Sequence, residues 1–207
     1  MIPATMPIKL TTKTPASPLT KTDLLIIFGK KGRKIKLPKG VRIPANAIES
    51  FAGKEREVWI TDALKGAAKR VLLLGLGKGR AISGELLRRT AAMAVKKAEQ
   101  TGCRSASVWV DLSLDHRAAG FGQALAEGAV MGSYRLSDFK SRAEPAILRR
   151  ISVYGDRAFN AGVRRGEAIG GANILARRLQ DTPANRMRPR DLVREARKLA
   201  GASARIS

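Results

Sequence analysis

Three closely spaced glycines form the arrangement in this chain that comes nearest to a phosphate-binding turn. Gly75, Gly77 and Gly79 follow directly on an apolar run, and backbone amides at a strand-to-helix turn can hold a phosphate group. A dinucleotide fingerprint needs its third glycine three residues beyond the second, and Arg80 stands there. A P-loop needs Ser or Thr after its Gly-Lys pair, where this chain has Gly79. The spacing therefore favours a tight turn over a nucleotide site.

Side chains that commonly serve as metal ligands or nucleophiles are scarce. His116 is the only histidine, and although two aspartates lie close to it, we interpret it as an exposed loop residue. Cys103 is the only cysteine, has no companion at metal-ligand spacing, and fits a small packed residue in a reducing compartment. No GxSxG motif is present, and Glu55 and Glu57 are expected to be solvated. We therefore predict no catalytic, cofactor-binding or metal-binding residue in this chain.

Positive charge is the unusual feature of the composition. Forty Lys and Arg against seventeen Asp and Glu give a formal net charge of +23. One interpretation is a surface that holds nucleic acid weakly, without sequence preference and in a salt-sensitive way. The other is a solvated surface, which the scattered distribution favours because a binding groove needs its charges to converge. The basic runs are Lys30–Lys36, Arg88–Arg89, Lys96–Lys97, Arg149–Arg150, Arg164–Arg165 and Arg177–Arg178.

The general composition fits a globular domain with an extension. A chain of 207 residues with 44% hydrophobic residues can bury a proper core. No window approaches the ~20 continuous apolar residues that a bilayer-spanning helix needs, and the N-terminus lacks the apolar core of a secretory signal. We expect a cytoplasmic protein without a membrane partner.

Apolar runs alternate with amphipathic segments along most of the chain. This alternation predicts an α/β fold, a mixed sheet with helices on both faces. The expected strands are Met6–Leu10, Asp23–Gly29, Glu57–Ile60, Arg70–Gly77, Ser107–Leu112 and Ala146–Tyr154. The expected helices are Ser83–Gln100, with Ser83 as N-cap, Ala118–Gly132 and Ala161–Leu179.

A rigid elbow follows the last of these helices. Pro183, within Asp181–Asn185, blocks helix continuation, and Pro189 suits the first turn of another helix. Leu192 and Leu199 lie on the apolar face of that short C-terminal helix. Without a partner this face would be exposed.

Three blocks of the sequence resemble the leucyl (cytosol) aminopeptidases, the M17 metallopeptidases. Leu72–Lys78 resembles the strand and "GLGK" turn of the family, and Ala126–Ser141 resembles its "EGaxLgsYrFdxyKs" signature. Ala176–Leu192 resembles the interdomain "ARdLxNtPxNxxTPxxLa" pattern, with Gln180-Asp181 and Arg188 as departures. The three blocks occur in the family order.

The resemblance implies a division of the chain and a role for it. Residues 1–160 would form the macro-domain-like N-terminal domain, and residues 161–207 the long linker helix and a truncated start of the catalytic domain. The family removes N-terminal amino acids from peptides with two divalent metals, zinc or manganese, held by its catalytic domain. The "NTDAEGRL" metal-ligand block of that domain is absent here, so the chain alone is expected to be inactive.

Partners and alternatives follow from the same resemblance. In the family, the N-terminal portion packs against neighbouring catalytic domains in a homohexamer and shapes access to the active sites. Self-association or binding to a catalytic domain is therefore expected. The alternative is a stand-alone basic module that holds nucleic acid non-specifically. A third hypothesis, an enzyme acting on ADP-ribose-like substrates, has little support from the residues.

Overall fold

A computed structural model describes residues 8–78, 82–110, 118–135 and 147–203. The chain divides into two compact units, Met1–Gly171 and Ala172–Ser207. The division falls inside a single long helix, α4, which spans Arg157–Asp181. The predicted domains, 1–160 and 161–207, stay a prediction.

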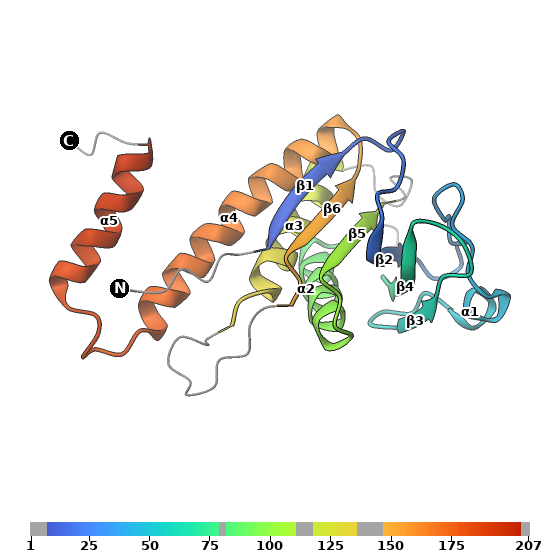
Figure 1. Cartoon of the computed structure of the whole chain (residues 1–207), viewed down its shortest axis with the longest axis horizontal. Helices are drawn as coiled ribbons and strands as arrows, with labels where there is room; N and C mark the ends of the chain where they lie inside the picture. Colours follow the sequence, from blue (N-terminus) through green and yellow to red (C-terminus); the bar gives the residue numbers. More distant parts are fainter. Residues whose placement is uncertain (1–7, 79–81, 111–117, 136–146, 204–207) are drawn as a thin grey trace. The chain divides into compact units, whose positions relative to one another are not determined.

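The first unit is built on a six-stranded mixed sheet (Figure 1). The strand order is β1-β6-β5-β2-β4-β3, and every neighbouring pair is parallel except β3 with β4. The predicted mixed α/β fold is thus confirmed. The strands are β1 (Lys9–Lys13), β2 (Thr22–Gly29), β3 (Val58–Asp62), β4 (Ala68–Gly75), β5 (Ser105–Trp109) and β6 (Arg150–Tyr154).

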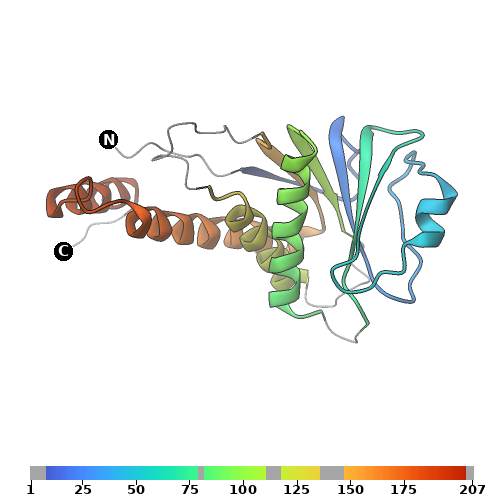
Figure 2. The same cartoon turned by 90° about the horizontal axis from the view of Figure 1, so that it is seen from below.

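One face of the sheet is covered by a layer of helices (Figure 2). These helices are α2 (Gly84–Gln100), α3 (Ala118–Gly132) and the first part of α4. The predicted N-cap of α2 is present, because the Ser83 hydroxyl accepts a hydrogen bond from the amide of Leu86 at 3.1 Å. Leu24 and Ile26 of β2 are fully buried and lie on one side of that strand, since they are two residues apart.

The opposite face is covered over only part of its width. Leu25 and Ile27 of β2 pack in a cluster with Ala47 and Phe51, which belong to or follow the short helix α1 (Ala45–Ser50). The three rows of residues across β1, β6 and β5 on this face are mostly polar. The paired positions are Lys9, Arg150 and Ser105, then Thr11, Ser152 and Ser107, then Lys13, Tyr154 and Trp109. No described helix of the first unit lies over this half of the face (Figure 1).

Several predicted boundaries shift in the structure. The first strand is Lys9–Lys13 rather than Met6–Leu10, because each of these residues pairs with a residue of β6; Met6 lies outside the described residues. β6 begins at Arg150; Ala146, where its start was predicted, lies outside the described residues. Helix α4 begins four residues earlier than predicted, because the carboxylate of Asp156 accepts a hydrogen bond from the Phe159 amide at 2.7 Å. The short helix α1 was not predicted.

The second unit contains the end of α4, the elbow and helix α5 (Pro189–Ser203). The predicted start of α5 at Pro189 is confirmed. At the elbow, the Thr182 hydroxyl donates to the carbonyl of Arg178 at 2.6 Å, and the Asp191 carboxylate accepts from the Arg188 amide at 3.1 Å. Leu192, with 46% of its surface exposed, and Leu199, with 59%, leave an apolar stripe on α5. Within the described residues, no helix has the length and apolarity to span a membrane.

Candidate anion-binding pocket

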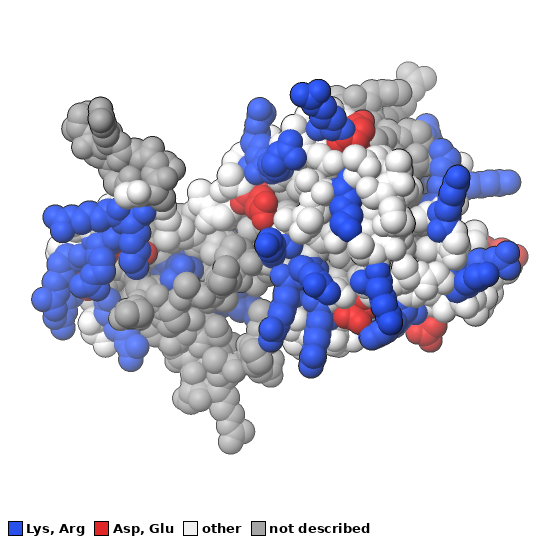
Figure 3. Space-filling model, turned by 45° about the horizontal axis from the view of Figure 1, so that its top comes forward, with Lys and Arg blue, Asp and Glu red and all other residues white. Residues whose placement is uncertain are grey.

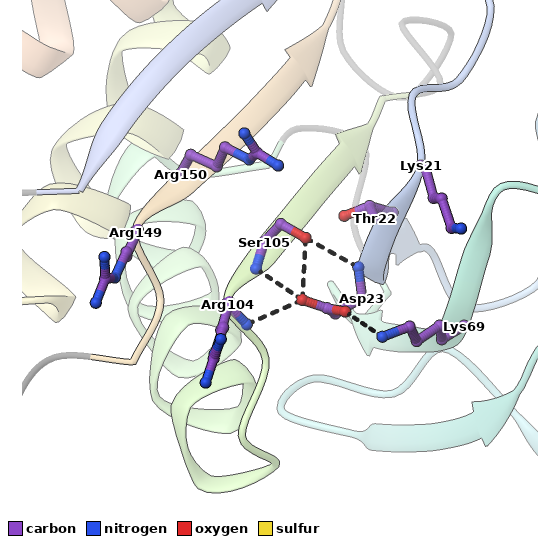
Figure 4. Close-up of a pocket in the computed structure, with 8 residues that line it drawn as sticks. All are labelled: Lys21, Thr22, Asp23, Lys69, Arg104, Ser105, Arg149 and Arg150. Carbon is purple, nitrogen blue, oxygen red and sulfur yellow. Dashed lines mark hydrogen bonds and ion pairs between the residues drawn. The ribbon is translucent and has the colours of Figure 1, made fainter.

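A pocket of about 440 Å³ opens at the amino ends of four strands of the first unit. Because β2, β4, β5 and β6 all run parallel, their amino ends meet at one edge of the sheet. The pocket carries five cationic side chains and one carboxylate. It is lined by Lys21, Thr22, Asp23, Lys69, Arg104, Ser105, Arg149 and Arg150 (Figure 4).

Strand register explains why these residues meet. Arg150 pairs with Ser105 on the neighbouring strand, and the Asp23 amide donates to the Ser105 hydroxyl at 3.1 Å. Arg149 and Arg104 are adjacent through a backbone hydrogen bond of 3.0 Å. The backbone of each strand start is therefore held by its neighbour, and the side chains project from a paired edge rather than from a free loop.

Asp23 is the central acceptor of the pocket. Its Oδ1 lies 2.8 Å from Lys69 Nζ. Its Oδ2 accepts hydrogen bonds of 3.1 Å from the amides of Arg104 and Ser105 and from the Ser105 hydroxyl. The hydrogen bond from Lys69 is the main cause that lowers the pKa of Asp23 from 3.8 to about 2; partial burial acts in the opposite direction but is outweighed.

The remaining cations of the pocket have no carboxylate of their own. Among the described residues, no ion pair joins Lys21, Arg104, Arg149 or Arg150 to an acid. All four are exposed at the pocket rim or wall. The Ser105 hydroxyl donates to Asp23, but the lowered pKa of that carboxyl makes it a weak base. The surplus of cations therefore favours recognition of negative charge over bond breaking.

Replacing Asp23 with asparagine tests this network. Asp23→Asn is expected to lower the free energy of unfolding by about 1–2 kcal/mol at neutral pH, because Lys69 loses its charged acceptor. A carboxyl group whose pKa is lower in the folded state than in the unfolded state stabilises the fold at pH values above the unfolded-state pKa. This stabilisation is lost as the pH falls through the folded-state pKa. The difference from the unchanged chain should therefore be full above about pH 5 and disappear towards pH 2.

Urea denaturation across this pH range measures the effect. Asp62→Asn is the matched control, because Asp62 is an exposed aspartate at the end of β3. The control should change stability by less than about 0.5 kcal/mol. A pH-independent loss in Asp23→Asn would contradict the assigned role of the carboxylate.

The space beside the glycine turn that resembled a phosphate site is occupied by the backbone of Gly53 and Lys54. A Cβ on Gly75 would lie 1.8 Å from the carbonyl oxygen of Lys54, and the Gly77 amide donates to the carbonyl of Gly53 at 2.9 Å. Gly77 has φ +77°, which a residue with a side chain rarely adopts. The glycines at these two positions allow two chain segments to approach closely; Gly79 lies outside the described residues.

Of the other residues considered from the sequence, those that the structure describes are not brought together. His116 lies outside the described residues. Cys103 is fully buried, where its sulfur lies 3.6 Å from Arg70 Nη2. Glu57 is not merely solvated as expected, since its two oxygens accept hydrogen bonds from the amides of Ala52 and Lys54. No group of three His, Cys, Asp or Glu side chains that could hold a metal occurs among the described residues.

The basic runs noted in the sequence lie in different surroundings. Arg88 pairs with the buried Glu127, and Arg89 pairs with Glu85 at 2.6 Å. Arg149 and Arg150 enter the pocket. Sequence reasoning missed the pocket, although one signal was available. A lysine or arginine stands directly before β2 and β5, at the first residue of β6 and at the second residue of β4, and parallel strand starts share one edge.

The fold places the chain in a class of α/β domains known from solved aminopeptidase structures. A tomato leucine aminopeptidase mutant (K354E) superimposes with a TM-score of 0.72, at 23% identity, over 94% of this chain and 42% of that chain. The bottromycin maturation enzyme BotP superimposes with a TM-score of 0.69, at 26% identity, over 87% of this chain and 37% of its own. This class is defined by the fold alone.

Sequence comparison gives the family. Residues 29–143 match the model of the cytosol aminopeptidase family, N-terminal domain. A probable cytosol aminopeptidase of Aquifex aeolicus is 31% identical over 80% of this chain, and the human cytosol aminopeptidase is 29% identical over 83%. The chain belongs to the cytosol aminopeptidase (M17) family, as the resemblance implied. It spans about a third of the length of these relatives, 34% and 35% respectively.

Proposed function

We propose that this chain is the non-catalytic N-terminal portion of a leucyl aminopeptidase-type metallopeptidase, acting in assembly and in access to the active site. The observation that carries the proposal is the match of residues 29–143 to the N-terminal domain of the family. The part of the chain that the structure describes supplies no catalytic arrangement. The names of the relatives, cytosol aminopeptidases, support a cytoplasmic location.

Metal chemistry belongs to another portion of the enzyme in this proposal. The BotP relative has been solved in complex with Mn, and the family resemblance implies two divalent metals. The residues described here do not fit such a centre, since they bring no three potential ligands together and two adjacent metals need several converging oxygen ligands. We therefore assign no step through a metal to this chain.

The apolar stripe of α5 supports a role in association. Leu192, Val193 and Leu199 are each about half exposed or more, and a short isolated helix gains most of its stability from packing of its apolar face. The proposed cover is the catalytic portion of the enzyme, in the same chain or in another copy. A homohexamer is the assembly that the family resemblance suggests.

An activity assay tests the proposal. The purified 207-residue chain should show no turnover of Leu-p-nitroanilide with manganese or zinc added, because hydrolysis requires ligands that the described residues do not bring together. A full-length member of the family serves as the positive control. Turnover that persists through repurification and disappears with a chelator would overturn the assignment of a non-catalytic role.

A basic module that holds nucleic acid is the second candidate. It is favoured by the spread of Lys and Arg over the face shown in Figure 3, where Asp and Glu are few. Binding of this kind would be weak and sequence-independent, with the logarithm of affinity falling by roughly 4–5 per decade of salt if ~5 phosphates are neutralised. The oligonucleotide titration described below separates it from binding in the pocket.

A further inference from the structure

The pocket at the amino ends of β2, β4, β5 and β6 holds more cationic side chains than its one described carboxylate neutralises. Lys69 is engaged by Asp23, whereas Lys21, Arg104, Arg149 and Arg150 share the pocket with no second carboxylate among the lining residues that the structure describes. Like charges held close together repel one another, which costs stability unless an anion or solvent compensates. An excess of this kind at one concave position is a feature that a bound anion would explain.

Asp23 does not cancel this excess. Its two oxygens already take one ammonium and three N–H or O–H donors. Figure 4 shows the carboxylate directed into this network between β2 and β5. Its negative charge is therefore satisfied in the wall of the pocket, and it does not engage the guanidinium groups of Arg104, Arg149 and Arg150.

The chemistry of the lining favours phosphate groups. Three of the available cations are arginines, whose planar fork of N–H donors matches two oxygens of one phosphate. They come from the starts of β5 and β6, where Arg149 N donates to Arg104 O at 3.0 Å and Lys9 N donates to Arg149 O at 3.1 Å. These backbone bonds fix the positions of the strand starts from which the three side chains extend.

The dimensions favour a compact ligand. A volume of about 440 Å³ lies within the range of small-molecule pockets, roughly 300–1,000 Å³. No aromatic side chain is among its described lining residues, whereas single-stranded nucleic acid is generally held by stacking on aromatic rings along an extended groove. The pocket is thus suited to a short, highly charged group rather than to a polymer.

We infer that this pocket binds a free, compact polyphosphate group, such as pyrophosphate or the triphosphate of a nucleotide. This goes beyond the proposed role of the chain in an aminopeptidase, and it does not depend on catalysis. Arg104, Arg149 and Arg150 donate to the phosphate oxygens, Lys21 adds charge at the rim, and the Asp23–Lys69 pair holds the wall in place.

The test compares two double variants of equal net charge. Sodium tripolyphosphate is titrated into the 207-residue chain at about 150 mM NaCl by isothermal calorimetry, with sulfate and acetate as anions of lower charge. Arg149→Gln/Arg150→Gln alters the pocket, and Arg164→Gln/Arg165→Gln removes the same charge from exposed positions on α4. Circular dichroism and thermal midpoints establish that both variants are folded, and Arg104→Gln provides an independent pocket variant.

The expected result is saturable one-to-one binding that weakens about tenfold or more in both pocket variants and less than about twofold in the α4 control. Equal weakening in pocket and control variants would show general attraction to a basic surface and overturn the inference, as would the absence of saturable binding. Single-stranded and duplex oligonucleotides form the second arm. Tighter binding of an oligonucleotide than of tripolyphosphate, lost in the pocket variants, would identify nucleic acid as the ligand and also overturn it.

Discussion

Replacing Gly128 with alanine is expected to lower the free energy of unfolding by about 3 kcal/mol. Helices α2 and α3 pack so closely at this point that a Cβ on Gly128 would lie 2.2 Å from the carbonyl oxygen of Arg88 and 2.6 Å from its Cα. The obstacle is backbone, which cannot rotate aside as a side chain can. The helices would have to separate, and a packed interior transmits such a shift rather than absorbing it.

The same helix provides the control. A Cβ on Gly120 would meet no atom within 4 Å, so Gly120→Ala should be neutral or should stabilise the helix by up to about 1 kcal/mol. Both variants are measured by urea denaturation of the 207-residue chain. A Gly128→Ala variant as stable as the Gly120→Ala variant would show that α2 and α3 are not packed as closely as described.

Replacing Arg135 with alanine is expected to cost a similar amount, about 3 kcal/mol. The side chain of Glu99 is only 4% exposed, and Arg135 is its charged partner, with Nε 3.1 Å from Oε2. The other oxygen of Glu99 has no hydrogen-bond partner among the described residues. Loss of the guanidinium would therefore leave a buried carboxylate without its counter-charge.

Two further variants test whether the unpaired charge of Glu99 causes this loss of stability. Arg89→Ala removes an exposed i,i+4 pair with Glu85 and should cost no more than about 0.5 kcal/mol. Adding Glu99→Gln to Arg135→Ala should recover part of the loss, since the unpaired charge is then gone. A double variant as unstable as the sum of the two single variants would mean that the two side chains act independently.

The described part of the block that resembled the family signature, residues 126–135, thus has a structural explanation. Glu127 pairs with Arg88 and accepts a hydrogen bond from Gln123 at 2.7 Å. Gly128 permits the close approach of α2, and Arg135 neutralises Glu99. These residues join α3 and the segment after it to α2. Their role in the described structure is packing and charge balance.

The long elements could be predicted from the sequence because their signals are local. Uninterrupted apolar runs defined β2 and β4, and Ser83 with a periodic apolar stripe defined the start of α2. Helix α1 could not be found in this way. It has six residues, no side-chain cap and only Ala47 buried among them, so its position depends on packing against β2 rather than on a pattern of its own.

The pocket could not be predicted from local sequence patterns either, for a different reason. Its cations extend from Lys21 to Arg150 in the sequence, and each alone is an ordinary surface residue. Only the order of the strands brings them to one edge, and that order is set by long-range pairing. The scattered charge that favoured a solvated surface in the sequence includes a subset that converges in space.

The pairing of β1 with β6 also constrains how the chain can fold. Lys9 lies opposite Arg150, so the edge of the sheet closes only after almost the whole first unit has been synthesised. Closing such a loop costs conformational entropy before the contacts between β1 and β6 can stabilise it. During synthesis β2, β4 and β5 can assemble early, while Leu10 and Ile151 remain without each other. The nascent domain therefore exposes an unpaired strand edge until β6 has been synthesised, a period in which association with another chain competes with completion of the sheet.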